Sequence, residues 1–269
     1  MITLLAAALW RLGYLIDSKT RLAPKKNSAF TTPLLGIGSL LAGGAGKTPY
    51  AAFWAQKLKS QGLSIAILCK NTGDENLWYS KKGFEVFTGN RFELCKKLDG
   101  KYDVIISDDG LEDRRLSHAF WVCLTWGERA ESVRDIIPHG NCRSLWKDHP
   151  EIVCVKTCAM DWEEKDADII FSMELDLPKN SEIVAIAGIA RSQRFFAGLE
   201  RNYRVVKKID CPDHFDISKK TEQALKLGLP VVITEKNAIR LPESILANKN
   251  VVVCGLTLTH RAQASACNL

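Results

Sequence analysis

LLGIGSLLAGGAGKTPY, residues 34–50, joins a short apolar run to a glycine-rich turn and then to the start of a helical pattern. A P-loop reads G-x-x-x-x-G-K-[ST]; its backbone N–H groups and lysine bind phosphates, and its hydroxyl binds Mg²⁺. Gly46, Lys47 and Thr48 match this pattern, whereas Leu41 occupies the position of the first glycine. A strand expected at residues 33–37 and a helix at 49–61 flank the turn as a P-loop requires.

The stretch therefore predicts a nucleotide site rather than a glycine-rich turn with a chance lysine. The predicted phosphate-binding residues are Gly43, Gly44, Ala45, Gly46, Lys47 and Thr48. Pro49 is compatible with the first turn of a helix, where its missing N–H would have no partner.

A P-loop also needs an acidic residue at the end of a neighbouring buried strand to hold Mg²⁺. The sequence VIISDD, residues 104–109, has this form, since Asp108 and Asp109 follow an apolar run. Two adjacent carboxylates repel each other unless a cation lies beside them. Thr48, Asp108 and Asp109 are the predicted metal site, with a solvated turn as the alternative.

Apolar runs of strand length recur along the chain. They lie at residues 63–68, 84–87, 102–107, 120–125, 151–156, 169–173, 182–187, 203–209, 231–234 and 251–254, with helical patterns at 193–199 and 219–227. Strands alternating with helices predict an α/β fold with a mostly parallel sheet flanked by helices.

We expect four parts in the chain. They are an N-terminal helix with a basic linker (1–26), a P-loop nucleotide-binding core (27–150), a smaller C-terminal lobe that completes the active-site cleft (151–260), and a disordered tail (261–269).

The composition excludes some classes of protein. The net charge is +6, but the positive charges are dispersed and no basic stripe is interleaved with aromatic residues, so nucleic-acid binding is not expected. Nine cysteines without C-x-x-C spacing give little support to a zinc site. An odd number of cysteines, several in apolar runs, predicts reduced, buried thiols in a cytosolic protein.

The amino terminus reads MITLLAAALWRLGYLI over residues 1–16 and is followed by a basic stretch. The apolar run is short for a membrane span, which needs about 20 apolar residues. A helix in the membrane interface is predicted, with Trp10 at the lipid–water boundary. A helix packed on the domain is the alternative.

Several further stretches appear in a fixed order along the chain. They are Gly73-Asp74-Glu75, Asp108-Asp109-Gly110-Leu111, Pro138-His139-Gly140-Asn141-Cys142-Arg143, Gln193-Arg194-Phe195-Phe196, Pro212-Asp213-His214 and Thr234-Glu235-Lys236-Asn237. Together with the glycine-rich loop, this order resembles the tetraacyldisaccharide 4'-kinase (lipid A 4'-kinase) family over residues 33–241.

The resemblance implies an enzyme that uses ATP and Mg²⁺. It would transfer the γ-phosphoryl group to the 4'-hydroxyl of an acylated glucosamine disaccharide 1-phosphate, at the cytoplasmic face of the bacterial inner membrane as a peripheral or monotopic protein. It further implies that Asp74 is a catalytic carboxylate partnered by His214, with Lys47 on the phosphates. Read alone, Asp74 is a turn residue and His214 a structural histidine.

Acceptor contacts are expected from the matched loops. The predicted residues are Glu75, Asn141 and Arg143. A guanidinium group matches phosphate oxygens in pairs, and Arg143 is favoured over Arg91, Arg114, Arg115 and Arg194 because it lies in a matched loop.

The chain departs from the family pattern at several positions. The loop before Asp74 is shortened, Glu112 and Asp113 replace a Gln-His pair, Ser144 replaces an acidic residue, and Phe215 replaces a second histidine. These changes concern the acceptor side and the metal shell. They leave open whether the activity is reduced or redirected.

Two alternatives stay open at this point. The chain could be a soluble P-loop ATPase or GTPase switch, although the guanine-specific N-K-x-D motif is absent from the sequence. It could also be a nucleotide-binding relative with altered catalysis. The sequence leaves open the oligomeric state and the acyl pattern of the acceptor.

Overall fold

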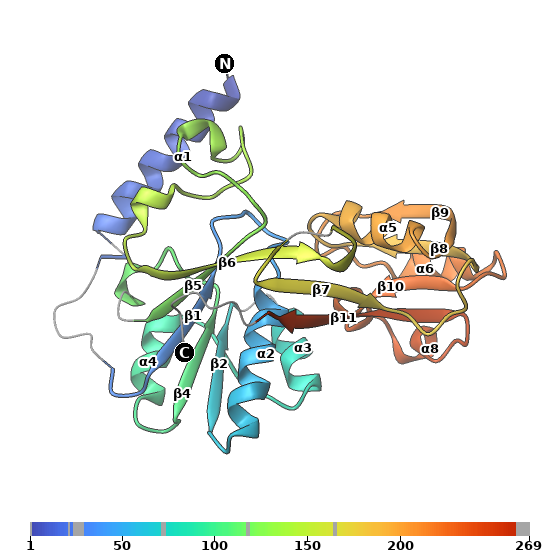
Figure 1. The fold of residues 1–269 in the computed structure, drawn as a ribbon, viewed down its shortest axis with the longest axis horizontal. Helices are drawn as coiled ribbons and strands as arrows, with labels where there is room; N and C mark the ends of the chain where they lie inside the picture. Colours follow the sequence, from blue (N-terminus) through green and yellow to red (C-terminus); the bar gives the residue numbers. More distant parts are fainter. Residues whose placement is uncertain are drawn as a thin grey trace. The chain divides into compact units, whose positions relative to one another are not determined.

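The computed structural model describes residues 2–20, 22–23, 30–70, 74–116, 119–163 and 166–261. Gly73, residues 24–26 of the basic linker and the tail from residue 262 lie outside this part. The chain divides into two compact units (Figure 1): unit 1 comprises Met1–Ala159, Lys165–Ile170 and His260–Leu269, and unit 2 comprises Met160–Glu164 and Phe171–Thr259. The four-part division expected from the sequence stays a prediction.

Unit 1 is built on a parallel sheet in the order β3-β2-β4-β1-β5-β6. Its strands are β1 (Leu34–Gly38), β2 (Ile65–Cys69), β3 (Glu85–Thr88), β4 (Val104–Asp108), β5 (Phe120–Thr125) and β6 (Ile152–Met160). The predicted parallel α/β sheet is therefore confirmed. Because β4 inserts between β1 and β2, the loops after β1 and β4 emerge side by side.

The helices of unit 1 are α1 (Ile2–Lys19), α2 (Lys47–Ser60), α3 (Asp74–Lys81) and α4 (Arg91–Leu98), with short 3₁₀ turns η1 (Arg114–Leu116), η2 (Val133–Asp135) and η3 (Trp146–Asp148). The helix α2 begins two residues earlier than expected, because Gly46 adopts a left-handed conformation that turns the chain into the helix. Neither α3 nor α4 was predicted, since eight residues carry little periodicity.

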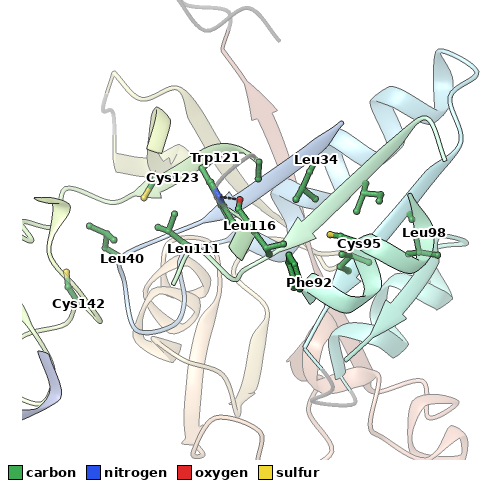
Figure 2. Close-up of a cluster of buried hydrophobic side chains, with 14 of the residues drawn as sticks. Leu34, Leu40, Phe92, Cys95, Leu98, Leu111, Leu116, Trp121, Cys123 and Cys142 are labelled. Atoms are coloured by element: carbon green, nitrogen blue, oxygen red, sulfur yellow. Dashed lines mark hydrogen bonds between the residues drawn. The ribbon is translucent and has the colours of Figure 1, made fainter. Parts of the chain in front are cut away.

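One face of this sheet is covered by α4. Phe92, Cys95 and Leu98 of α4 pack against alternate residues of the strands, among them Leu34 and Ile105. Figure 2 shows that the same buried cluster continues past Trp121 to Leu111, Leu40 and Cys142.

Trp121 is the largest side chain of this cluster and is only 1% exposed. Its indole N–H donates to the carbonyl of Leu116 at 3.1 Å, the dashed line in Figure 2. The ring lies directly over Gly36 of β1, where an added Cβ would come within 2.3 Å of Trp121 Cε3. Glycine at position 36 is thus required by the close approach of the neighbouring strand.

Unit 2 repeats the plan on a smaller scale. Its strands β8 (Glu182–Ala187), β9 (Arg204–Asp210), β10 (Val231–Thr234) and β11 (Val251–His260) run in the order β11-β10-β8-β9, with β7 (Ile169–Glu174) beside β11. The pairs β11–β10, β10–β8 and β8–β9 are parallel. The remaining helices are α5 (Ser192–Glu200), α6 (Ser218–Leu225), α7 (Glu235–Ala238) and α8 (Glu243–Leu246), with the 3₁₀ turn η4 (Asp161–Glu163).

The strand β8 is buried on both faces. Ile183 and Ala185 pack with Phe196 of α5, whereas Val184 and Ile186 pack with residues of α6 and α8. This explains why the sequence of β8 is continuously apolar rather than alternating. No helix in the described part of the chain has the length and apolarity needed to cross a membrane.

We expect Gly36→Ala to destabilise unit 1 by about 3 kcal/mol, because the methyl group overlaps the indole of Trp121. Urea denaturation followed by far-UV circular dichroism measures the change. The same substitution in a Trp121→Leu background should cost much less, since the overlap is gone. Equal costs in the two backgrounds would show that the ring contact is not the cause.

Candidate active site

The glycine-rich loop has the geometry of an anion-binding turn. Gly43, Gly44 and Gly46 all have positive φ angles (105°, 65° and 80°), which residues with a Cβ rarely adopt. The loop leads directly into Lys47 and Thr48, the first two residues of α2. The N-terminus of a helix presents unpaired N–H groups and the positive end of its dipole, so it favours bound phosphate.

Leu41, at the position of the first P-loop glycine, is buried with 1% of its surface exposed. It forms an isolated antiparallel bridge with Cys142. The next residue, Ala42, donates its N–H to the carbonyl of Asn141 at 2.9 Å. The departure from the P-loop pattern is thus accommodated by pairing the start of the loop with the segment that carries Asn141 and Arg143.

The predicted metal residues of β4 and α2 meet in the structure. The hydroxyl of Thr48 donates to Asp108 Oδ2 at 2.9 Å. Tyr79 of α3 donates to the same oxygen at 2.8 Å and lies 3.1 Å from the carbonyl oxygen of Thr48. Tyr79 is fully buried, and its burial together with the charge of Asp108 raises its pKa well above the usual value. A protonated Tyr79 is therefore favoured, and its hydroxyl donates to Asp108.

Asp109 lies among cations. Lys47 Nζ is 3.8 Å from Asp109 Oδ1, and Arg143 is 3.0 Å from Asp109 Oδ2. Arg143 also contacts Glu112 at 3.4 Å. Although burial opposes ionisation, Lys47 and Arg143 hold the pKa of Asp109 far below its usual value. The predicted phosphate lysine and the predicted acceptor arginine thus flank one carboxylate.

Asp108 behaves differently. Burial raises the pKa of Asp108; the charge of Lys47 opposes this shift, and the charge of Asp109 adds to it. The adjacent carboxylates consequently have opposite shifts, because Asp109 has the nearer cations. A divalent cation beside the pair would favour ionisation of both.

The donor set fits Mg²⁺. A hydroxyl and two carboxylates are hard oxygen ligands, and Asp109 Oδ1 is buried with no hydrogen-bond partner among the described residues. No cluster of three or more His, Cys, Asp or Glu side chains in the described part could hold a metal ion by itself. Thr48, Asp108 and Asp109 would therefore share the ion with phosphate oxygens and water, which is usual for Mg²⁺.

Arg91, which the sequence analysis considered only as a less favoured acceptor contact, supports the acidic turn in the structure. It opens α4 and donates to the carbonyl oxygen of Asp108 at 2.7 Å. Its charge also lowers the pKa of Asp109, after Lys47 and Arg143. The acidic turn is therefore held by α2, α3, α4 and the segment that carries Arg143. No local motif marks this role, because the partner of Arg91 is a backbone carbonyl 17 residues away on β4.

Trp126 is a second component that the sequence did not reveal. Its indole N–H donates to the carbonyl of Ala45 within the glycine-rich loop, at 3.2 Å. The turn that carries Trp126 is held by Glu128, which accepts from Thr125 Oγ1 and from the Trp126 N–H, each at 2.7 Å.

Asp74 and Glu75 occupy the first turn of α3, where the helix dipole favours negative charge. Asp74 is buried, with 5% of its surface exposed. Tyr79 of the same helix binds Asp108, so α3 is anchored to the metal residues one and a half turns after Asp74. Asp74 lies in unit 1, on the element that borders the Thr48–Asp108 contact.

His214 lies in unit 2 and has a left-handed backbone, with φ of 66°. Arg240 NH2 lies 2.7 Å from His214 Nδ1, and a second Arg240 nitrogen donates to the His214 carbonyl. A guanidinium can only donate, so Nδ1 accepts and a neutral ring carries its proton on Nε2. The predicted pairing of Asp74 with His214 stays a prediction.

Comparison with known proteins gives a consistent result. The family model described as "Tetraacyldisaccharide-1-P 4'-kinase" matches residues 69–268. A tetraacyldisaccharide 4'-kinase of Shewanella frigidimarina is 25% identical, over 91% of this chain and 83% of the relative. A protein of the same name from Haemophilus influenzae is 28% identical, over 86% of this chain and 80% of the relative.

A solved structure, the "apo" form of LpxK from Aquifex aeolicus in complex with ATP, has the same fold. It superposes with a TM-score of 0.65 and 18% identity, over 95% of this chain and 93% of that chain. The predicted α/β fold is thereby confirmed.

We expect Tyr79→Phe to weaken binding of Mg²⁺–ATP about tenfold. The substitution removes one of the two donors to Asp108 Oδ2, and a hydrogen bond to a charged group contributes about 1.5–3 kcal/mol. Calorimetry with and without Mg²⁺ measures the change. Tyr102→Phe is a matched control. Tyr102 also donates to a carboxylate, but its partner is the exposed Glu85 and not a residue of the site. Equal affinities of wild type and Tyr79→Phe would contradict the assignment.

Proposed function

The chain belongs to the tetraacyldisaccharide-1-P 4'-kinase family, and we propose that it transfers the γ-phosphoryl group of ATP to the 4'-hydroxyl of a tetraacylated glucosamine disaccharide 1-phosphate in lipid A biosynthesis. The supporting observation is the contact of Thr48 with Asp108 beside the Lys47–Asp109 ion pair. This arrangement suits a triphosphate with Mg²⁺ at the end of β4.

The nucleotide side of the site follows from these contacts. The backbone from Gly43 to Gly46 would surround the phosphates, while Lys47 would leave Asp109 and neutralise the β- and γ-phosphates. Bound Mg²⁺, held by Thr48, Asp108 and Asp109, would supply positive charge to the transferring phosphoryl group. Tyr79 and Arg91 keep Asp108 in place for this role.

Asp74 is the proposed general base. A sugar hydroxyl is a weak nucleophile, and a positioned carboxylate can accept its proton as the new bond to phosphorus forms. Asp74 suits this role because it is buried at the start of α3, and α3 is tied to Asp108 through Tyr79. His214 is the proposed partner of this carboxylate, as the family resemblance implies.

Arg143, Asn141 and Glu75 are the proposed acceptor-binding residues. Arg143 lies between Asp109 and Glu112, and a guanidinium matches the oxygens of a phosphate such as the one on the acceptor. Asn141, two residues before Arg143, is exposed. Glu112, one of the positions that depart from the family pattern, would compete with the acceptor phosphate for Arg143 and so lower the affinity for the acceptor.

A radiolabel assay tests the function directly. The protein is incubated with γ-³²P-ATP, Mg²⁺ and a tetraacylated disaccharide 1-phosphate in detergent, and the lipid products are resolved by thin-layer chromatography. A labelled bisphosphorylated lipid is the expected product. Label released only as inorganic phosphate would point to an ATPase and overturn the proposal.

We expect Asp74→Asn to lower kcat of phosphoryl transfer at least about 100-fold, the usual contribution of a general base, while ATP affinity stays unchanged. Asp166→Asn is a suitable control, because Asp166 has 83% of its side chain exposed. Transfer and ATP binding are measured on the same preparations. A kcat within threefold of wild type would remove Asp74 from the mechanism.

We further propose that α1 seats the enzyme on a lipid surface, at the cytoplasmic face of the bacterial inner membrane. Five large apolar residues of α1 recur at intervals of three and four, so they form one stripe along the helix. They are Ile2, Leu5, Leu9, Leu12 and Ile16, exposed to 84%, 64%, 60%, 54% and 56%. Such a stripe on a soluble protein favours an interfacial helix.

Vesicle sedimentation tests this membrane contact. The variant Leu9→Ser/Leu12→Ser should lose about 100-fold in partition onto anionic vesicles, since each leucine contributes about 1.5–3 kcal/mol when fully buried. Leu227→Ser/Leu256→Ser is the matched control, with leucines exposed to 52% and 38% outside α1. If both variants partition like the wild type, the stripe does not bind lipid.

A further inference from the structure

The face of α1 opposite the apolar stripe is bound to the segment 132–149, which we call the 132–149 loop. Trp10 donates its indole N–H to the carbonyl of Arg143 at 2.9 Å. The next residue, Arg11, donates to both carboxylate oxygens of Asp148, at 3.0 and 3.3 Å. Two consecutive residues of α1 therefore hold the part of the loop that carries the proposed acceptor arginine.

Apolar and aromatic contacts support these hydrogen bonds. Ala7 of α1 is completely buried and packs with Ile136 and Leu145 of the 132–149 loop. The ring of Tyr14 lies 5.7 Å from that of His149. The helix is thus docked along about two turns, from Ala7 to Tyr14, so the loop and α1 form one packed element.

Inside the loop, His149 fixes the residue that follows Arg143. Ser144 Oγ lies 2.6 Å from His149 Nε2, and His149 Nδ1 lies 3.0 Å from Glu151 Oε1. Ser144 and His149 are both buried. This chain of contacts ties Ser144 through His149 to Glu151, just before β6.

The backbone of Arg143 is consequently held on both sides. Its N–H donates to the carbonyl of Leu40, just before the glycine-rich loop, at 2.7 Å. Its carbonyl accepts from Trp10, and its guanidinium binds Asp109 and Glu112. A displacement of Trp10 would therefore change the position from which the Arg143 side chain reaches the acceptor.

We propose that Trp10 is a positioning residue for Arg143, so that the N-terminal helix shapes the acceptor side of the active site independently of any contact with lipid. The inference rests on the proposed kinase function. Lipid contact by Trp10, which is half exposed, does not require its N–H to bond this particular carbonyl. The hydrogen bond from the Trp10 N–H to the carbonyl of Arg143, 133 residues away, does not contribute to partition onto lipid. It indicates that Trp10 acts on the 132–149 loop.

The test compares Trp10→Phe with the wild type in the radiolabel assay, with the acceptor dissolved in excess detergent so that vesicle binding does not enter. Phenylalanine keeps an apolar ring and removes the donor. We expect KM for the acceptor to rise about fivefold, the equivalent of one neutral hydrogen bond, with KM for ATP and vesicle partition unchanged. Gly13→Ala is the matched control on α1, because its added Cβ meets nothing within 4 Å.

A double-mutant cycle separates positioning from general damage to the fold. In an Arg143→Lys background, Trp10→Phe should change the acceptor KM less than twofold, because the guanidinium that it positions is gone. A fivefold effect in both backgrounds would overturn the inference, as would an unchanged acceptor KM in Trp10→Phe alone. A wild-type protein that forms no phosphorylated lipid refutes the kinase function instead, which keeps the two failures distinct.

Discussion

The parallel register between β1 and β4 is the constraint on which the site depends. Ile37 pairs with Asp108, so the carboxylates at the end of β4 emerge beside the loop that follows β1. The hydroxyl of Thr48 can then reach Asp108, and Lys47 can reach Asp109, without any adjustment of the sheet. A shift of one residue would turn Asp108 to the opposite face and separate the two halves of the site.

This register explains which part of the site could be predicted from the sequence. The glycine-rich turn and the acidic pair each follow a recognisable apolar run, and the parallel sheet brings such ends together. The strands were predicted well because burial on both faces makes them continuously apolar, as β8 illustrates. The short helices α3 and α4 were missed, since eight residues give little periodic signal.

The residues that support the site were not predictable from local patterns. Tyr79, Arg91 and Trp126 come from three separate elements, and each contacts the site through hydrogen bonds to residues distant in sequence. Any tyrosine, arginine or tryptophan in a short helix or turn would look alike in the sequence. Their roles follow only from the strand order, which places α3, α4 and the end of β5 around β4 and β1.

The N-terminal helix shows how one element can satisfy two requirements. Its apolar stripe, spaced for one helix face, lies outward, while Ala7, Trp10 and Arg11 bind the 132–149 loop on the other side. Binding to a lipid surface alone would not require the bidentate pair of Arg11 with the nearly buried Asp148. Packing against the protein alone would bury the apolar stripe, which is exposed here. Under the proposed function, a soluble nucleotide and a lipid-bound sugar must meet at one site. The contacts of α1 with the 132–149 loop would then fix that site relative to the lipid surface.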